Sequence, residues 1–220
     1  MNKLVLDKEY YLIKDEEISI DIKKKNITLE IEGKVKINDL NSKEDINLHI
    51  ILNDDAKLIY NKFSENISNI NVNIDVHNNC KLSYNQSLYN TIEGNYEVFT
   101  NILGSNNISD INFYGVSNLK GKIKVNATGD IKKNIKNNEM LENVRILSLN
   151  EEENTIYPNL LVSSDEAIVN HNATISGLNE DYLFYLESKG LSKEESAKLI
   201  VKGFILSKLD IDKDDIDIKF

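Results

Sequence analysis

The chain has very few residues that interrupt strands or cross-link a fold. Its 220 residues include one proline, one cysteine and no tryptophan. Because proline cannot donate a hydrogen bond to a β-ladder, a chain whose single proline is Pro158 leaves almost all possible strand interiors uninterrupted. The single cysteine, Cys80, excludes an intramolecular disulfide, which is typical of a protein from a reducing compartment. We therefore expect a cytoplasmic protein.

Long apolar runs and common catalytic motifs are missing as well. No apolar stretch approaches the roughly 20 residues that cross a bilayer, and residues 1–8 reach charged side chains too soon for a secretory leader. The sequence has no Gly-rich phosphate loop, no Gly-x-Ser-x-Gly motif and no His-Glu-x-x-His motif. We therefore expect no membrane association, no ATPase activity and no catalytic residues in this chain.

The charge balance is acidic, with 36 Asp and Glu against 26 Lys and Arg and a net charge of −10. Nucleic acids and anionic membranes select faces rich in Lys and Arg, so neither is expected as a partner. The acidic clusters at residues 151–153 and 214–215 are expected to be solvated loop charge and not acid/base pairs. We attribute the abundance of Asn, Lys and Ile to codon bias and not to function.

From about Ile18 to Val169 the dominant pattern is an alternation of apolar and polar residues, which is typical of half-buried strands. Asn, Asp and Gly separate these segments, as expected for turns. Many short strands with frequent turns indicate a sandwich, a barrel or a stacked β-solenoid, and the pattern alone leaves these three open. No strict repeat is visible, so a solenoid would have to be irregular. The predicted strands lie at residues 18–22, 27–31, 46–50, 56–60, 70–76, 96–103, 108–114, 122–127, 144–149 and 159–163.

The period changes in the last fifth of the chain, where a first helix is predicted. Asn179 is a suitable N-cap residue, and it is followed by the carboxylates of Glu180 and Asp181, which oppose the helix dipole. This helix should run to about Lys189 and end at Gly190, because glycine accepts the left-handed conformation that follows a helix end.

A capping box predicts a second helix. Ser192 and Glu195 are spaced so that each side chain can satisfy a backbone donor of the other. Residues 210–220 are acidic and alternating, and form either a short strand or a loose tail. The apolar stripe on one face of this helix consists of Ala197, Ile200, Val201, Phe204 and Ile205.

Several short fragments follow one another in a characteristic order. They are Tyr-Pro-Asn-Leu at residues 157–160, His-Asn-Ala-Thr at 171–174, Glu-Asp-Tyr-Leu-Phe-Tyr at 180–185, Gly-Leu-Ser at 190–192 and Gly-Phe at 203–204. This order resembles the C-terminal part of the SufB/SufD family, whose members belong to the machinery that assembles iron–sulfur clusters. The resemblance covers about residues 142–206. It implies a right-handed parallel β-helix over residues 1–177, followed by a C-terminal helical segment and tail over residues 178–220.

The resemblance aligns His171 with a family histidine that is implicated in building or holding a nascent cluster between two subunits. A neutral imidazole can ligate iron, and a residue at a strand end can be presented to a partner. The alternative is a structural role, in which His171 hydrogen-bonds the turn into the first helix. We expect no cofactor in the isolated chain, and at most a transient iron–sulfur cluster shared with a partner subunit.

The chain departs from the family at the positions that would hold a cluster. Asn143 stands where a SufB-type scaffold cysteine is expected, Asn172 replaces the carboxylate after the histidine, and Val169 replaces a SufD-type cysteine. Since clusters need thiolate ligands, this chain cannot supply a conventional site alone. His77 and Cys80 have a metal-like spacing, but a structural zinc site needs four ligands, so Cys80 is expected to be a core or turn residue.

The resemblance also implies two partners: a SufC-like ABC-type ATPase, bound by the C-terminal helices, and a second SufB/SufD-like subunit or another copy of this chain, bound by the β-stack. An exposed apolar stripe is a reasonable docking surface. The alternative is that the stripe only caps the open end of the β-stack. The candidate ATPase contacts are Phe184, Tyr185, Leu186, Gly190, Leu191, Ile200, Gly203 and Phe204.

The favoured hypothesis is a scaffold or interaction subunit of an iron–sulfur cluster assembly complex that is not itself an enzyme. One alternative is a carbohydrate-active or carbohydrate-binding β-solenoid with rows of Asn, Asp and Tyr along a groove. Another is a degenerate paralogue that retains the interaction surfaces and has lost cluster chemistry.

Overall fold

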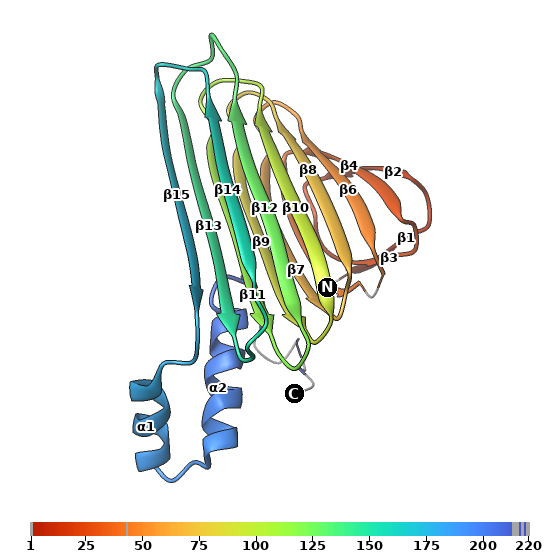
Figure 1. Ribbon diagram of the computed structural model, residues 1–220. Helices are drawn as coiled ribbons and strands as arrows, with labels where there is room; N and C mark the ends of the chain where they lie inside the picture. Colours follow the sequence, from red (N-terminus) through yellow and green to blue (C-terminus); the bar gives the residue numbers. More distant parts are fainter. Residues whose placement is uncertain (1, 43, 213–215, 217, 219–220) are drawn as a thin grey trace.

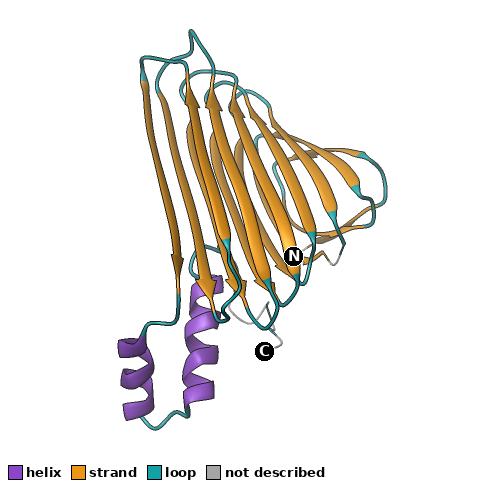
Figure 2. Ribbon diagram, in the orientation of Figure 1, coloured by secondary structure: helices purple, strands orange, loops and turns teal. Residues whose placement is uncertain are grey.

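The computed structural model describes residues 2–42, 44–212, 216 and 218. The described residues form a long series of strands followed by two helices (Figures 1 and 2). None of these helices has the length and apolar character needed to cross a bilayer. The strands are β1 (Asn2–Leu6), β2 (Tyr10–Lys14), β3 (Glu17–Ile22), β4 (Asn26–Glu32), β5 (Lys34–Ser42), β6 (Ile46–Leu52), β7 (Lys57–Glu65), β8 (Asn69–Val76), β9 (Lys81–Asn90), β10 (Glu93–Ile102), β11 (Ile108–Ser117), β12 (Lys122–Ile131), β13 (Asn138–Ser148), β14 (Thr155–Val162) and β15 (Ala167–Ser176); the helices are α1 (Glu180–Ser188) and α2 (Lys193–Leu206).

The strands form two parallel sheets. The odd-numbered strands β1 to β15 make one sheet and the even-numbered strands β2 to β14 make the other, each in chain order. Because the chain passes from one sheet to the other at every step, two consecutive strands make one coil of a solenoid. The predicted parallel β-solenoid with a C-terminal helix pair is confirmed, and the sandwich and barrel alternatives are wrong. The list of predicted strands lacked β1 and β2, which precede residue 18, and also β5, β9 and β15.

The coils become longer along most of the chain. Asn2 pairs with Ile18, sixteen residues further on, whereas Ile108 pairs with Glu139, thirty-one residues further on. The solenoid consequently widens from its N-terminal to its C-terminal end (Figure 1). A repeat whose length changes has no fixed period, which explains why the sequence shows no strict repeat.

Apolar residues from alternate strand positions fill the space between the sheets. Tyr60 and Tyr84 stack there with ring centroids 5.5 Å apart, and burial raises the pKa of both hydroxyls. A fully buried ion pair joins Lys62 Nζ to Asp39 Oδ2 at 2.5 Å, and the Tyr60 hydroxyl donates to the same carboxylate oxygen at 3.1 Å. The interior of the narrower coils is therefore mainly apolar, with one polar patch beside the tyrosines.

A row of hydrogen-bonded asparagines runs along the outer face of the odd-numbered sheet. Each side-chain amide donates to the side-chain oxygen of the asparagine one coil earlier, over 2.9, 3.2, 3.0, 3.1 and 2.9 Å in turn. Amide rows of this kind stabilise parallel in-register strands. Asparagine abundance therefore has a structural explanation at these positions, beside the codon bias inferred from composition. The six members are Asn38, Asn61, Asn85, Asn112, Asn143 and Asn172.

Both predicted helices form with the predicted caps. The Asn179 side chain accepts a hydrogen bond from the Tyr182 backbone at 3.0 Å, and Gly190 has a φ of 96°, in the left-handed region. The capping box of Ser192 and Glu195 is complete. The last strand ends at Ser176 and α1 begins at Glu180, on either side of the boundary expected between residues 177 and 178.

Helix α2 and the residues after it cover part of the outer face of the odd-numbered sheet. Val201 and Ile205 are fully buried, and the Ser87 hydroxyl donates to the Ile205 carbonyl at 2.7 Å. The backbone of Asp210 exchanges two hydrogen bonds with the Asn61 side chain, at 3.0 and 3.1 Å. The apolar stripe therefore packs on a sheet face and does not cap the open end of the β-stack. The apolar cluster under this segment contains Phe63, Tyr89, Val116 and Leu147 from four neighbouring strands of the odd-numbered sheet, together with Val201, Ile205, Leu209, Ile216 and Ile218.

Two isoleucines of the C-terminal tail pack on the solenoid. Ile216 and Ile218 are buried against the sheet, and no regular strand includes Ile211. Residues 213–215, 217 and 219–220, with the acidic pair at 214–215, lie outside the described residues. The other acidic cluster, at residues 151–153, is exposed in a loop as predicted.

The asparagine row can be tested by one substitution at its centre. Asn85 is 4% exposed and bonds to both neighbours in the row, so Asn85→Ala leaves the Asn112 amide without its acceptor. We expect the free energy of unfolding to fall by about 2–3 kcal/mol in urea titrations. The matched control is Asn47→Ala, which interrupts a shorter row with Asn26 and Asn71 on the uncovered outer face of the even-numbered sheet. There we expect a loss below about 1 kcal/mol; equal losses for both variants would contradict a special role for the covered row.

Candidate functional site at the terminal coil

His171 lies in the middle of β15, the last strand of its sheet. The strand continues for five residues beyond it, to Ser176. The expectation of a histidine at a strand end was therefore wrong, and so was its alternative role in the turn to α1. In the sheet, His171 is paired with Glu142 of β13, and its side chain is exposed because β15 is the edge strand of its sheet among the described residues.

Glu142 lies beside His171 and was not among the site residues predicted from the sequence. Its side chain faces the interior, is 1% exposed, and its Oε2 has no hydrogen-bond partner among the described residues. Burial without a compensating charge raises the pKa of this carboxyl to about 7. The sequence did contain a sign of this inward orientation, because Glu142 alternates with Met140 and Val144, two apolar residues of the inward-facing row.

Gly129 of β12 provides space for this carboxylate on the opposite sheet. A Cβ atom at this position would lie 2.7 Å from Met140 Sδ and 3.0 Å from Glu142 Oε1. Only a residue without a side chain fits there while Met140 and Glu142 keep their positions. The thioether sulfur and the carboxylate oxygen consequently converge on one small region of the wide end.

The outward-facing positions of the same two strands are occupied by the end of the asparagine row. The Asn172 amide donates to Asn143 Oδ1 at 2.9 Å. These are the two positions where the family resemblance places a thiolate and a carboxylate. Val169, at the third departure, is half-buried and pairs with Met140. The structure thus brings together on β13 and β15 the three positions at which the sequence differs from the family. None of the three side chains is a soft metal ligand.

Cys80 does not compensate for this loss. Its side chain is fully buried in the turn before β9, and its thiol donates to the Asn53 carbonyl at 3.1 Å. Burial raises the pKa of the thiol to about 11, so it stays protonated near neutral pH. Within the part of the chain that the structure describes, no group of three or more His, Cys, Asp or Glu side chains could hold a metal ion. The donors present do not fit a thiolate-ligated cluster.

The predicted docking residues divide into two groups. Phe184 and Tyr185 of α1 are 74% and 58% exposed, and no residue of α1 is buried. Gly190 and Gly203 are exposed, and a half-buried group comprises Leu186, Leu191, Ile200 and Phe204.

Phe204 has a contact of its own on the sheet. Its ring lies 5.2 Å from the ring of Tyr114, and the Arg145 guanidinium lies 5.8 Å from Tyr114 and 5.7 Å from Phe204. Arg145 is the only arginine in the sequence. Phe204 therefore helps to anchor α2 to β11 and β13, whereas α1 buries none of its residues.

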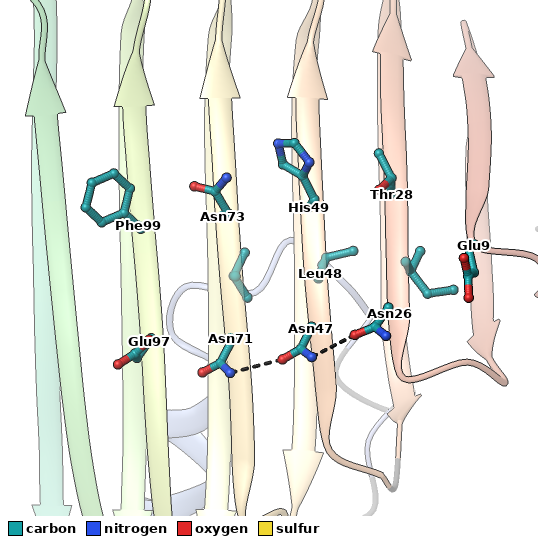
Figure 3. Close-up of a pocket in the computed structure, with 12 residues that line it drawn as sticks. Glu9, Asn26, Thr28, Asn47, Leu48, His49, Asn71, Asn73, Glu97 and Phe99 are labelled. Atoms are coloured by element: carbon teal, nitrogen blue, oxygen red, sulfur yellow. Dashed lines mark hydrogen bonds between the residues drawn. The ribbon is translucent and has the colours of Figure 1, made fainter.

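A shallow groove of about 640 Å³ lies on the outer face of the even-numbered sheet (Figure 3). His49 and Phe99 line it beside the shorter asparagine row, and His49 Nε2 lies 2.8 Å from Asp75 Oδ2. Its two carboxylates, Glu9 and Glu97, lie at opposite ends, with β4, β6 and β8 between them. Neighbouring strands are about 4.8 Å apart, so these carboxylates are too distant for the roughly 5–10 Å separation of a glycosidase pair.

The pKa of Glu142 leads to a testable pH dependence. The unfolded chain ionises this group near 4.5 and the folded chain near 7, so the free energy of unfolding falls as pH rises between these values. The size of this loss is about 3 kcal/mol. Glu142→Gln removes the ionisation, and urea titrations at pH 5 and pH 8 should show a variant that gains stability over the wild type at the higher pH.

Glu139→Gln is the matched control, since Glu139 is on the same strand with an exposed side chain. It should follow the wild-type pH dependence. If Glu142→Gln also follows it, the raised pKa is contradicted.

Comparison with known proteins places the terminal coil and helices in a family. A family model described as "SUF system FeS cluster assembly, SufBD core domain" matches residues 89–204, just over half of the chain. The chain is 33% identical over 108 residues to an iron–sulfur cluster assembly SufBD family protein of Galdieria sulphuraria, covering 46% of this chain and 47% of that protein. A SufBD family protein of Pyrococcus horikoshii is 51% identical over 49 residues, or 22% of this chain and 11% of that protein.

A third relative, a SufBD family protein of Staphylococcus aureus, is 41% identical over 56 residues, or 26% of this chain and 12% of that protein. The matched segments span less than half the length of these relatives. The family model extends from the end of β9 to α2, and so includes both the terminal coil and the C-terminal helices. The chain belongs to the SufBD family of SUF system iron–sulfur cluster assembly proteins.

Proposed function

We propose that this chain is a non-enzymatic subunit of a cytoplasmic iron–sulfur cluster assembly complex, where it acts as an interaction partner of a SufC-like ABC-type ATPase. The observation that carries the proposal is the exposure of α1. Its Tyr182, Phe184 and Tyr185 are 64%, 74% and 58% exposed, and none of its nine residues is buried. Exposed aromatic residues on one short helix are the usual anchors of a protein interface.

The attachment of α2 supports a mechanical role. Val201 and Ile205 bury their side chains on the odd-numbered sheet, and the Arg145, Tyr114 and Phe204 stack holds the same helix. Helix α1 contacts α2 and lies beyond the strand ends (Figure 1). A partner bound to α1 would therefore pull on the solenoid through α2, and a displacement of the ATPase would reach the terminal coil.

The terminal strands support pairing with a second subunit. Among the strands that the structure describes, β14 and β15 each have one neighbour in their sheets and so each presents an open edge. Leu161, Ile168 and Ile175 on these strands are 53%, 64% and 45% exposed. Uncovered strand edges with apolar side chains favour association. We propose that another copy of this chain, or another SufBD subunit, covers this coil.

We propose further that the isolated chain holds no cluster, and that a partner supplies the thiolates for any transient one. His171 would face that partner from β15. In this form the proposal includes the degenerate paralogue, which keeps both interaction surfaces without its own cluster ligands. The carbohydrate alternative has less support, because the carboxylates of the open groove do not converge.

The ATPase interaction can be tested with the double variant Phe184→Ala/Tyr185→Ala. Truncating two interface aromatics removes on the order of 2 kcal/mol or more, so affinity for the SufC-like ATPase of the same organism should fall at least about tenfold. Isothermal titration calorimetry measures this loss, and circular dichroism should show an unchanged fold because neither side chain is buried.

The control is Leu12→Ala, since Leu12 is 53% exposed on β2 at the narrow end of the solenoid. It should bind like the wild type. Failure of the wild-type chain to bind the ATPase at micromolar concentration, or an equal loss for both variants, would reject the proposal.

A further inference from the structure

A row of three lysines crosses the outer face of the odd-numbered sheet near the start of its strands. Lys34, Lys57 and Lys81, here called the lysine row, are register partners on β5, β7 and β9, and all three side chains are exposed. Neighbouring strands are about 4.8 Å apart, so the row spans about 10 Å. Like charges side by side on neighbouring strands are destabilising. Three adjacent cations in a chain with a net charge of −10 therefore call for an explanation.

The fold does not neutralise the lysine row. Among the described residues none of its three ammonium groups takes part in an ion pair, whereas Lys36 on β5 pairs with Glu17 at 3.4 Å and with Asp210 at 3.0 Å. The row therefore keeps its positive charge available to an anionic group from outside the chain. Three further carboxylates lie around the row without forming an ion pair with it, those of Asp15, Glu16 and Asp110.

A groove of about 560 Å³ lies along the lysine row, and all three lysines line it. Ile59 of β7 and Ile108 of β11 belong to the same lining, and Ile108 is 46% exposed. Helix α2 packs elsewhere on this face, over Val116 and Leu147. The groove thus combines an apolar surface with a cationic edge, and this combination suits an occupant that carries both carboxylates and apolar side chains.

The C-terminal segment of the chain shows how such an occupant can bind. Asp210, which also lines the groove, places its carboxylate 3.0 Å from Lys36 Nζ, and its backbone exchanges two hydrogen bonds with the Asn61 side chain. Leu209 beside it is buried in the apolar cluster on the same face. An irregular acidic segment is therefore already held here by an ion pair, backbone hydrogen bonds and an apolar contact.

We propose that the lysine row and its groove bind an acidic, extended segment of a partner protein, in which carboxylates alternate with apolar side chains. An extended chain rises about 3.3 Å per residue, so carboxylates two residues apart are separated by about 6.6 Å. Two of them fit along the row, each between two ammonium groups, while the side chain between them faces the opposite side, toward Ile59. This surface is separate from α1 and from the edges of β14 and β15, so the inference does not rest on the proposed function.

The test is fluorescence anisotropy with the full chain and a labelled peptide of sequence Asp-Ile-Asp-Ile-Asp-Ile. At about 0.1 M salt the Debye length of about 10 Å screens the distant negative charges and retains the local ion pairs. We expect saturable one-to-one binding under these conditions, and weaker binding toward about 1 M salt. The triple variant Lys34→Gln/Lys57→Gln/Lys81→Gln should lose affinity at least about tenfold, because each lysine contributes an ion pair.

Lys124→Gln is the matched control, since it removes an exposed strand lysine from the even-numbered sheet. It should bind the peptide like the wild type. Urea titrations should show the triple variant to be at least as stable as the wild type, so that lost binding is not a result of unfolding. Absence of saturable binding by the wild type at about 1 mM peptide, or unchanged binding by the triple variant, would overturn the site.

Inorganic triphosphate is the second probe, because it carries negative charge without apolar side chains. Tighter binding of the peptide than of triphosphate supports the inference. Binding of triphosphate without binding of the peptide would overturn it and identify the lysine row as a site for small anions.

Discussion

Parallel, in-register pairing of successive coils is the constraint on which the other features of this protein depend. Register decides which residues meet between coils, and alternation then decides which of them face the interior. In the odd-numbered sheet the same register places Asn61 beside Asn85 outside and Tyr60 beside Tyr84 inside. A slip of one residue would break the amide row and turn the interior side chains outward. The asparagine row therefore specifies the register in addition to stabilising it.

The change in coil length makes the two ends of the solenoid different. The narrow end is formed by short strands, whereas the wide end carries His171, the open edges of β14 and β15, and both helices (Figure 1). Helix α2 lies on the outer face of the odd-numbered sheet and leaves the edge of β15 free. The aromatic residues of α1 and the strand edges are thus separate surfaces near one end. The two proposed partners would therefore use different surfaces and would not compete with each other.

The sequence predicted the elements that depend on local rules and missed those that depend on register. Alternation identified most strands, and Asn179, Gly190 and the capping box of Ser192 and Glu195 located both helices, because caps are formed by residues close in the chain. The coil length changes at successive steps, so the pairing of Asn143 with Asn172 could not be inferred from spacing. The same uncertainty concealed the proximity of Glu142 to His171. Composition, for its part, could not distinguish structural asparagines from codon bias.

The asparagine row occupies two of the positions at which the family resemblance places cluster ligands. Asn143 accepts a hydrogen bond from Asn172 and donates one to Asn112, so a cysteine at position 143 would interrupt the row on both sides. A carboxylate at position 172 would lose the donor that bonds to Asn143. These outward-facing asparagines of the terminal coil are therefore committed to the hydrogen-bonded row. In the proposed role, thiolates would come from another subunit, and pairing at the terminal coil would place them beside these asparagines.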